Sequence, residues 1–284
     1  APEEPTPAPA PVAAATPAAS VEVEGPAAKP ADADTANTPS AAPRASDHTR
    51  AGSIASIGLQ MEGGSRHFSY VDRLTNTLRP YDLFVAPVVK VNGDVYPLLG
   101  TRIPVLSGLG AQGSYAHAFA LSSQDEAGTR VGTSWQSFDL GIRERLPLGE
   151  SFILGVDLGY GDTSFTFDDP VTPTEQLPSV HYKYLRGGFD GRYVHGDLSF
   201  TAGIGYRDVM STGDFAALFP RSKVGAVDAE LGAAYLVARG VEITLQVDYA
   251  RYFFSLLPQP GDKYVAGGAL DEMASLSLGA AYLF

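Results

Sequence analysis

The 284-residue chain contains no cysteine and no run of eighteen or more consecutive apolar residues. The missing run excludes a membrane-spanning helix, which needs about twenty apolar residues in succession. The missing cysteine is in keeping with an exported protein that never has to manage a thiol, and it excludes a lipid-modified cysteine at the start of this numbering. The chain begins Ala1-Pro2-Glu3, and we expect this to be a mature N-terminus that follows removal of a signal peptide.

Basic residues are also few, with 20 Lys and Arg against 32 Asp and Glu and a net charge of −12. Nucleic-acid binding is therefore not expected, because phosphate neutralisation needs a basic face. The five histidines show no metal-ligand spacing, and pairs such as Gly203 and Gly205 lie inside strand-like segments rather than before a helix. We therefore predict neither a metal nor any other cofactor.

Aromatic residues are absent from residues 1–50, which consist mostly of Ala, Pro, Thr, Ser and Asp. Such a segment buries too little apolar surface to offset its chain entropy, so we predict a disordered tail. Its proline content favours extended polyproline II, with a reach on the order of 150 Å. We expect the tail to be periplasmic and to contact peptidoglycan or other envelope proteins.

What the remainder of the chain does have is apolar and polar residues in alternation. In the segment 240–249, Val241, Ile243, Leu245, Val247 and Tyr249 share one face, and Glu242, Thr244, Gln246 and Asp248 share the other. A period of two indicates a strand with one apolar and one polar face. The same pattern recurs along residues 51–284 and predicts ten strands, near 53–70, 80–97, 104–121, 130–146, 151–166, 180–195, 197–210, 222–238, 240–256 and 264–284. The first two are interrupted by Pro87 and by the pair Gly63-Gly64, which favour a bulge or an edge.

The connections and the tyrosines favour a transmembrane barrel over a soluble one. Short links at 147–150, 195–197 and 238–240 alternate with long links near 166–180, 210–222 and 256–264. Outer-membrane barrels have short periplasmic turns and longer external loops. On the apolar faces, tyrosines fall at two heights, as expected for the two membrane interfaces. Those near the tight turns are Tyr193, Tyr235 and Tyr282, and those near the opposite side are Tyr160, Tyr206 and Tyr249.

The chain ends with apolar or aromatic residues at every second position, and Tyr282 and Phe284 are the last two of them. This ending resembles the signal by which the barrel-assembly machinery of diderm bacteria recognises its clients. Residues 51–284 thus resemble bacterial outer-membrane β-barrel proteins. The resemblance implies an all-β, transmembrane, antiparallel up-and-down barrel that contacts outer-membrane lipid and the assembly machinery. With ten strands, both termini would be periplasmic.

The general layout is also similar to outer-membrane barrels of myxobacteria, on segments such as 182–186, 219–224 and 265–270. Some barrels of those organisms belong to gliding and adhesion machinery. This second resemblance implies an anchoring or assembly role, by analogy of fold alone.

The inward faces of the predicted strands carry charges of both signs in similar number. A ten-strand barrel is only slightly wider than the eight-strand barrel that side chains fill completely, so paired charges would close its lumen. The alternative is a narrow conduit in which the same residues set ion selectivity. The predicted lumen charge network consists of Asp139, Arg143, Asp157, Arg186, Asp190, Arg192, Arg207, Asp228, Glu230, Glu242 and Asp248.

Two groups of residues were weighed as catalytic. Ten-strand barrels include the omptin proteases, which use aspartate and histidine at the external rim, and Asp168-Asp169 with His181 would be the matching residues; we expect a loop turn there instead. His67-Phe68-Ser69 resembles the His-x-Ser motif of outer-membrane lipid A deacylases, in which histidine activates the serine. That motif lies on a late strand of smaller barrels, and no partner carboxylate is identifiable here. We interpret His67 and Ser69 as a rim or lumen pair.

The sequence therefore predicts an integral outer-membrane barrel without enzymatic activity, which anchors or assembles an envelope or surface complex. A narrow, porin-like channel for ions or small solutes is the alternative.

Overall fold

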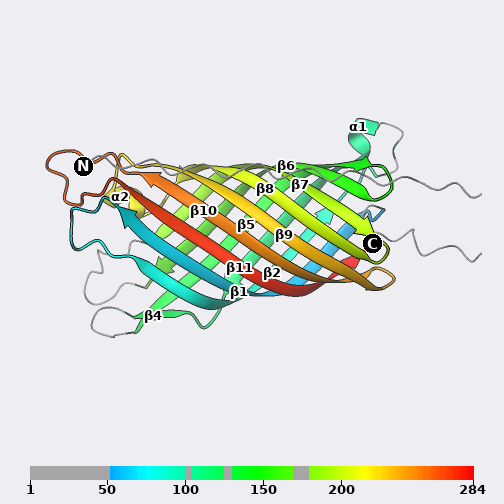
Figure 1. The fold of residues 1–284 in the computed structure, drawn as a ribbon, viewed down its shortest axis with the longest axis horizontal. Coiled ribbons are helices and arrows are strands. Elements are labelled where there is room, and N and C mark those ends of the chain that lie inside the picture. The colour runs from blue at the N-terminus through cyan, green and yellow to red at the C-terminus, as the bar shows by residue number, and fades with distance from the viewer. Residues whose placement is uncertain (1–51, 100, 102–103, 125–129, 169–178) are drawn as a thin grey trace, which may run out of the picture. The chain divides into compact units, whose positions relative to one another are not determined.

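The computed structural model describes residues 52–99, 101, 104–124, 130–168 and 179–284, so the predicted tail at 1–50 lies outside the described residues. Eleven strands and two short helices make up the described part of the chain (Figure 1). The strands are β1 (Ala55–Val71), β2 (Tyr81–Val95), β3 (Leu109–Ala118), β4 (Ser122–Gln124), β5 (Arg130–Leu148), β6 (Phe152–Phe167), β7 (Val180–His195), β8 (Leu198–Ser211), β9 (Lys223–Ala238), β10 (Val241–Ser255) and β11 (Gly268–Leu283). The helices are α1 (Pro104–Ser107) and α2 (Phe215–Leu218).

These strands form one closed antiparallel barrel. Apart from β3 and β4, each strand pairs with the next along the chain, and β1 pairs with both β2 and β11, which closes the ring. β3 and β4 act as one strand of this ring, because both pair with β5. The predicted ten-strand, up-and-down architecture is confirmed.

The predicted strand ranges agree with the structure to within four residues at every end, except for the third. That strand was expected at 104–121, but residues 104–107 form α1 and the pairing with β2 stops at Ala118. Ala120 has a φ of 55°, a left-handed conformation that a non-glycine residue adopts at a cost, and it separates β3 from β4. The predicted tight turns are present, and each contains a glycine at positive φ: Gly149, Gly196 and Gly240.

The expected interruption of the first two strands is a β-bulge. Gly64 is opposite Ala86 while Arg66 is opposite Leu83, so two residues of β2, at positions 84 and 85, face one residue of β1. An extra residue in one strand shifts every side chain beyond it relative to its partner strand. Beyond this bulge, β1 and β2 have a different register from the one they have near the tight turns.

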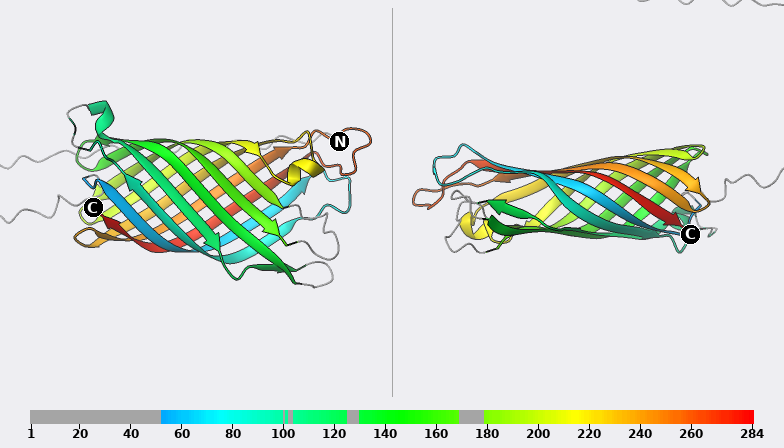
Figure 2. Two further views of the ribbon diagram at one scale, coloured as in Figure 1. Left: turned by 180° about the vertical axis from the view of Figure 1, so that it is seen from behind. Right: turned by 90° about the horizontal axis from the view of Figure 1, so that it is seen from below.

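The barrel has two unlike ends (Figure 2). At the turn end lie the three tight turns, the start of β1 and the end of β11, and also one longer link, 96–108, which carries α1. At the loop end lie the long links, among them 72–80, 212–222 and 256–267. The predicted asymmetry therefore holds, with the link between β2 and β3 as its exception. Across the described residues, no helix is long and apolar enough to span a bilayer.

Candidate functional site

The outer wall of the barrel carries an apolar band that ends sharply. On β6, the outward positions run from Phe152 through Leu158 to Tyr160, and the next outward residue toward the loop end is Asp162. Eight residues of strand at about 3.3 Å each, tilted by about 40°, give a band about 20 Å tall. This is close to the roughly 25 Å apolar band of outer-membrane barrels.

A set of polar outward residues lies on the part of the wall toward the loop end. Its members are matched by strand register, from Asp162 opposite Lys183, to Arg251 opposite Glu272, and on to His67 opposite Asp82. We call these six residues, together with Asp208, the polar ring. Because the strands continue beyond the polar ring, their residues nearest the loop end lie outside the apolar band.

All six predicted interface tyrosines point outward and are between 36% and 52% exposed. Tyr193, Tyr235 and Tyr282 lie near the turn end, and Tyr160, Tyr206 and Tyr249 lie just below the polar ring. The terminal residue Phe284 is paired with β1, where its backbone N–H donates to the carbonyl of Ala55 at 2.9 Å. The tyrosines thus bracket the apolar band at its two edges.

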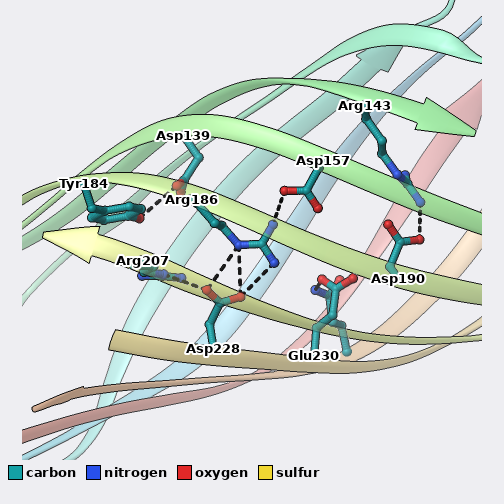
Figure 3. Close-up of polar contacts among 10 residues, drawn as sticks. Asp139, Arg143, Asp157, Tyr184, Arg186, Asp190, Arg207, Asp228 and Glu230 are labelled. Carbon is teal, nitrogen blue, oxygen red and sulfur yellow. Dashed lines mark hydrogen bonds and ion pairs between the residues drawn. The ribbon is translucent and has the colours of Figure 1, made fainter. Parts of the chain in front are cut away.

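The inner face is charged, and all eleven residues of the predicted network lie on it. Arg186 is the centre: its guanidinium bonds Asp157 on one side and Asp228 on the other (Figure 3). Asp228 also accepts from Arg207 Nε at 3.0 Å. On the same inner face, Tyr184 donates its hydroxyl to Asp139 at 2.8 Å. These hydrogen bonds and ion pairs therefore link the inner faces of β5 to β9, which are consecutive strands on one side of the barrel.

The remaining predicted charges are paired as well. Arg143 bonds Asp190, and Arg192 donates to Glu242 at 2.7 Å. Glu230 and Asp248 are bridged by the amide of Gln246, which is 3.5 and 2.7 Å from them. Most of these inward charges therefore meet a partner of opposite sign, whereas Glu230 is contacted by the amide of Gln246.

Six further charged residues of the lumen were missed in the sequence. Arg145 donates to Asp94 at 3.0 Å, Lys90 lies 3.4 Å from Glu62 and 3.6 Å from Asp248, and Arg66 bonds Asp271. All lie on β1, β2, β5 and β11. Alternation along the strands could have placed Arg66 and Asp271 in the lumen. Arg66 is in phase with the inward residues Gln60 and Glu62 of β1, and Asp271 with Ser275 and Ser277 of β11.

Beyond the polar ring the inner face becomes aromatic. We call this group the aromatic plug: Phe68, Phe165, Tyr182, Tyr184, Phe215, Phe219, Tyr252, Phe254 and Tyr264. Phe215 and Phe219 come from the 212–222 link. The ring centre of Phe215 lies 4.7 Å from that of Phe254 and 6.0 Å from that of Phe68. Leu78 and Leu256 enter the same cluster from two other loop-end links. The links thus fold into the mouth and fill it.

A fully buried charge triad underlies the plug. Arg66 makes two hydrogen bonds to Asp271, at 2.8 and 2.7 Å, and Tyr182 donates its hydroxyl to the same carboxylate at 2.6 Å. The Arg66 guanidinium also lies 4.2 Å from the ring centre of Phe165. The triad therefore joins three strands, β1, β7 and β11, and connects them to the plug through Tyr182 and Phe165.

Between the plug and the turn end, an internal cavity of about 380 Å³ remains. Eight acidic and six basic side chains line it, including those of Arg186 and Asp228. The balance of signs favours neither an anion nor a cation along this space.

The residues weighed as omptin-like do not form a site in the described structure. Asp169 lies outside the described residues, and His181 bonds Asp162 rather than Asp168, at 2.7 Å. The inward positions of the mouth carry the aromatic plug instead of carboxylates. Among the described residues, no group of three or more His, Asp or Glu is placed to hold a metal ion.

His67 and Ser69, interpreted above as a rim or lumen pair, do not face the lumen. Both are on the outward face of β1, since the inward positions there are Arg66 and Phe68. The structure also places a carboxylate that the sequence did not reveal: Asp82 hydrogen-bonds Nδ1 of His67. The bulge between β1 and β2 sets that pairing, and a bulge cannot be located from alternation alone.

Comparisons with known proteins agree with the fold. The outer-membrane protease OmpT of Escherichia coli aligns at 13% identity over 81% of this chain and 96% of that chain, with a TM-score of 0.50. Neisserial surface protein A aligns at 10% identity over 80% and 97% of the two chains, with a TM-score of 0.34. Outer membrane protein AlkL aligns at 12% identity over 82% and 90%, with a TM-score of 0.37.

No family model matches the chain, and no curated protein does either. At such low identities the likeness to OmpT concerns the fold alone: the chain has the fold of a bacterial outer-membrane β-barrel.

Proposed function

We propose that this chain is an integral outer-membrane barrel with a sealed lumen, which serves as an anchoring or assembly subunit of an envelope or surface complex. In this role the barrel holds a fixed position in the bilayer and presents its loop end to partners outside. The turn end, with the two ends of the barrel strands, would face the periplasm. No chemistry within the lumen is required.

Two levels of inward side chains support the proposal. In the middle, Arg186 joins Asp157 and Asp228 on the side formed by β6 to β9, and toward the loop end the aromatic plug packs inside the barrel. A conducting pore needs a continuous path of water, and buried, mutually paired charges leave little room for one. A sealed barrel suits a scaffold better than a pore.

The location rests on the outer wall. The apolar band, the tyrosines at its two edges and the polar ring match the profile of a bilayer-embedded barrel. The described fold of this chain is also that of OmpT, an outer-membrane protease.

Residues 1–50 lie outside the described structure, and their proposed role follows from composition alone. A Pro- and Ala-rich tail at the periplasmic end would reach peptidoglycan or an envelope partner. Deletion of residues 1–50 should then abolish the capture of a partner that the full chain retains, whereas equal capture by both chains would contradict this role.

A narrow channel remains the second candidate, favoured by the cavity of about 380 Å³. The two functions are separated by single-channel conductance of the refolded full chain in planar bilayers. Silence is expected, with folding verified by heat-modifiable gel migration. Stable conductance of the folded full chain would contradict the sealed-lumen proposal.

A matched variant checks that the assay can detect an opening. Arg186→Gly combined with Phe215→Gly and Phe219→Gly removes the central bridge and the inserted part of the plug. This variant should conduct if it folds. Conductance of the variant together with silence of the natural chain would support the two-level seal.

A further inference from the structure

The wall of the barrel contains one place where neighbouring strands part before their ends. β2 pairs with β3 only over the half nearer the turn end, and the next contact is a hydrogen bond of 3.0 Å from the backbone N–H of Phe119 to the carbonyl of Pro87. Beyond it the chain bends away from β2 and continues as β4, which pairs with β5 alone among the described strands. We call this place the seam, formed by residues 81–87 of β2 on one side and 119–124 on the other.

Both borders of the seam are free strand edges. A strand inside a sheet directs its backbone N–H and C=O groups alternately to its two neighbours. On one side, β2 is paired with β1 as far as Tyr81, which lies opposite Phe68. On the seam side, the described part of the chain offers residues 81–86 no backbone partner, and it offers the outer edge of β4 no partner strand. Unpaired edges of this kind are ready to pair with another extended backbone.

The seam is closed from the inside by side chains. The hydroxyls of Tyr81 and Ser123 bond each other across it at 2.8 Å. Behind it lies Trp135 of β5, which packs against a small buried cluster that includes Ala86 and Ala118. A Cβ atom at Gly64 would lie 2.6 Å from the Trp135 ring, so only the glycine of β1 leaves room for this ring. The lumen can therefore stay sealed while the backbone edge of β2 stays unpaired.

The free edge of β2 lies at the upper border of the apolar band. Asp82 belongs to the polar ring, and Phe84 and Val85 follow it toward the turn end. These two side chains point outward and are 91% and 57% exposed, and Phe119 across the seam is 42% exposed. Lipid chains can cover such side chains but offer no hydrogen bond to an unpaired backbone. An extended polypeptide can cover both, because its own backbone pairs with the edge.

A small apolar ligand and a second copy of this chain fit the seam less well. The internal cavity is lined by Trp135 but by no residue of 81–87 or 119–124, so it does not reach the seam. Two copies inserted in the same direction are related by an axis along the membrane normal. With strands tilted by about 40°, the β2 strands of two such copies would cross at about 80° and could not pair.

We propose that the seam is the docking site of a partner protein, which adds one extended segment as a strand on the free edge of β2. The segment would run antiparallel to β2, toward the loop end. Its outward side chains would be apolar and lie beside Phe84 and Phe119. Its inward side chains would be small, because Ala86, Ala118 and Trp135 lie behind them. This inference rests on the proposed function, to which it adds the place and the kind of contact by which the anchor holds its partner.

The first test is amide hydrogen exchange of the folded full chain, which reports whether the edge is free. The seam-side amides of residues 81–86 should exchange at least about tenfold faster than those of residues 89–94 on the same strand, which are paired on both sides. Equally slow exchange of both groups would mean that the edge is already covered and would overturn the proposal.

The second test adds a defined probe, a synthetic peptide of alternating valine and alanine matched in length to residues 81–86. At saturation it should slow exchange of the seam-side amides about tenfold and change the fluorescence of Trp135, the single tryptophan of the chain. The matched control is the same peptide with N-methyl groups on alternate residues, which cannot donate to β2. Equal effects of the two peptides, or none from either, would contradict strand addition.

The third test identifies the partner in the cells that make the chain. Phe84 is replaced by the photo-crosslinking residue p-benzoylphenylalanine, and the control carries it at Tyr206, an outward residue just below the polar ring on β8. We expect a protein adduct at position 84 alone, with the cross-link in a segment of alternating apolar residues. Lipid adducts alone at both positions, or the same protein adducts at both, would overturn the proposal.

Conductance of the same preparation keeps this inference separate from the sealed lumen. A silent barrel that binds neither the peptide nor a protein at position 84 removes the docking site alone. A conducting barrel that still pairs with the peptide removes the sealed lumen alone.

Discussion

Asp228 is the residue on which the closure of the lumen can be tested most directly. Its carboxylate accepts from Arg186 at 2.8 Å and from Arg207 at 3.0 Å, and its side chain is 10% exposed. Asp228→Asn keeps the size and removes the charge. Arg207 would then lose its carboxylate partner, and Arg186 would keep only Asp157. Removal of one partner from a buried ion pair costs about 3–5 kcal/mol, so we expect a loss of that size in the free energy of unfolding.

Asp157→Asn is the matched control, because Asp157 bonds only Arg186, which would keep Asp228. Loss of one hydrogen bond to a charged group costs about 1.5–3 kcal/mol. The two substitutions remove the same charge from neighbouring sites of one network. The difference between them therefore measures the second arginine that Asp228 holds.

The assay is urea unfolding in lipid vesicles, followed by the fluorescence of Trp135, the single tryptophan of the chain, which lies 6.0 Å from Phe165. With a slope of about 2 kcal/mol per M, Asp228→Asn should lower the midpoint by about 1.5–2.5 M urea. Between about 0.05 and 0.5 M salt this difference should persist, since buried pairs are screened weakly. Equal, small shifts for both variants, or their disappearance in salt, would mean a water-filled lumen and would refute the closure.

Three further outcomes follow from the wall, the loop end and the plug. Leu158→Arg, in the middle of the apolar band, should lower the free energy of unfolding by about 2–4 kcal/mol in the same assay. Thr166→Arg, on the same face of β6 beyond the polar ring, should lower it by about 0–1 kcal/mol. Similar losses for the two variants would mean that the apolar band is not where we place it. Hydrogen bonds from Arg221 and from the backbone N–H of Gln259 lower the pKa of the Asp262 carboxyl. The contact therefore stabilises the 256–267 link above the ordinary aspartate pKa, and this stabilisation is lost as the pH falls through the lowered pKa. The NMR shift of the Asp262 side chain should titrate at lower pH in the natural chain than in Arg221→Gln, and identical titrations would contradict the contact. Phe215→Ala should make the 212–222 link sensitive to protease in the folded barrel while β8 and β9 remain protected, and unchanged resistance would mean that the link does not depend on its place in the plug.

The strands, their two faces and the heights of the tyrosines could be predicted because each is a local property. Alternation with a period of two assigns Leu245 outward and Glu242 inward without knowledge of any partner strand. The tight turns could be predicted for the same reason, since Gly149, Gly196 and Gly240 supply the positive φ at which neighbouring strands reverse.

The contacts between side chains of different strands could not be predicted, because they depend on the register between strands that are far apart in the sequence. Arg66 and Asp271 are 205 residues apart, and only closure of β1 on β11 brings them together. Alternation could say that both face inward, but not that they meet below the plug.

The contact between His67 and Asp82 shows the same division on a smaller scale. The sequence placed His67 and Ser69 on one strand but gave them no carboxylate and assigned them to the rim or lumen. A single bulge put Asp82 opposite His67, and the position of Arg66 on the inner face turned His67 outward toward the membrane edge. The sequence alone determined which residues of each strand face inward and which face outward, because alternation depends only on the order of residues within that strand. Only the tertiary structure decided which of them meet, because pairing requires a register that is fixed by bulges and by closure of the ring.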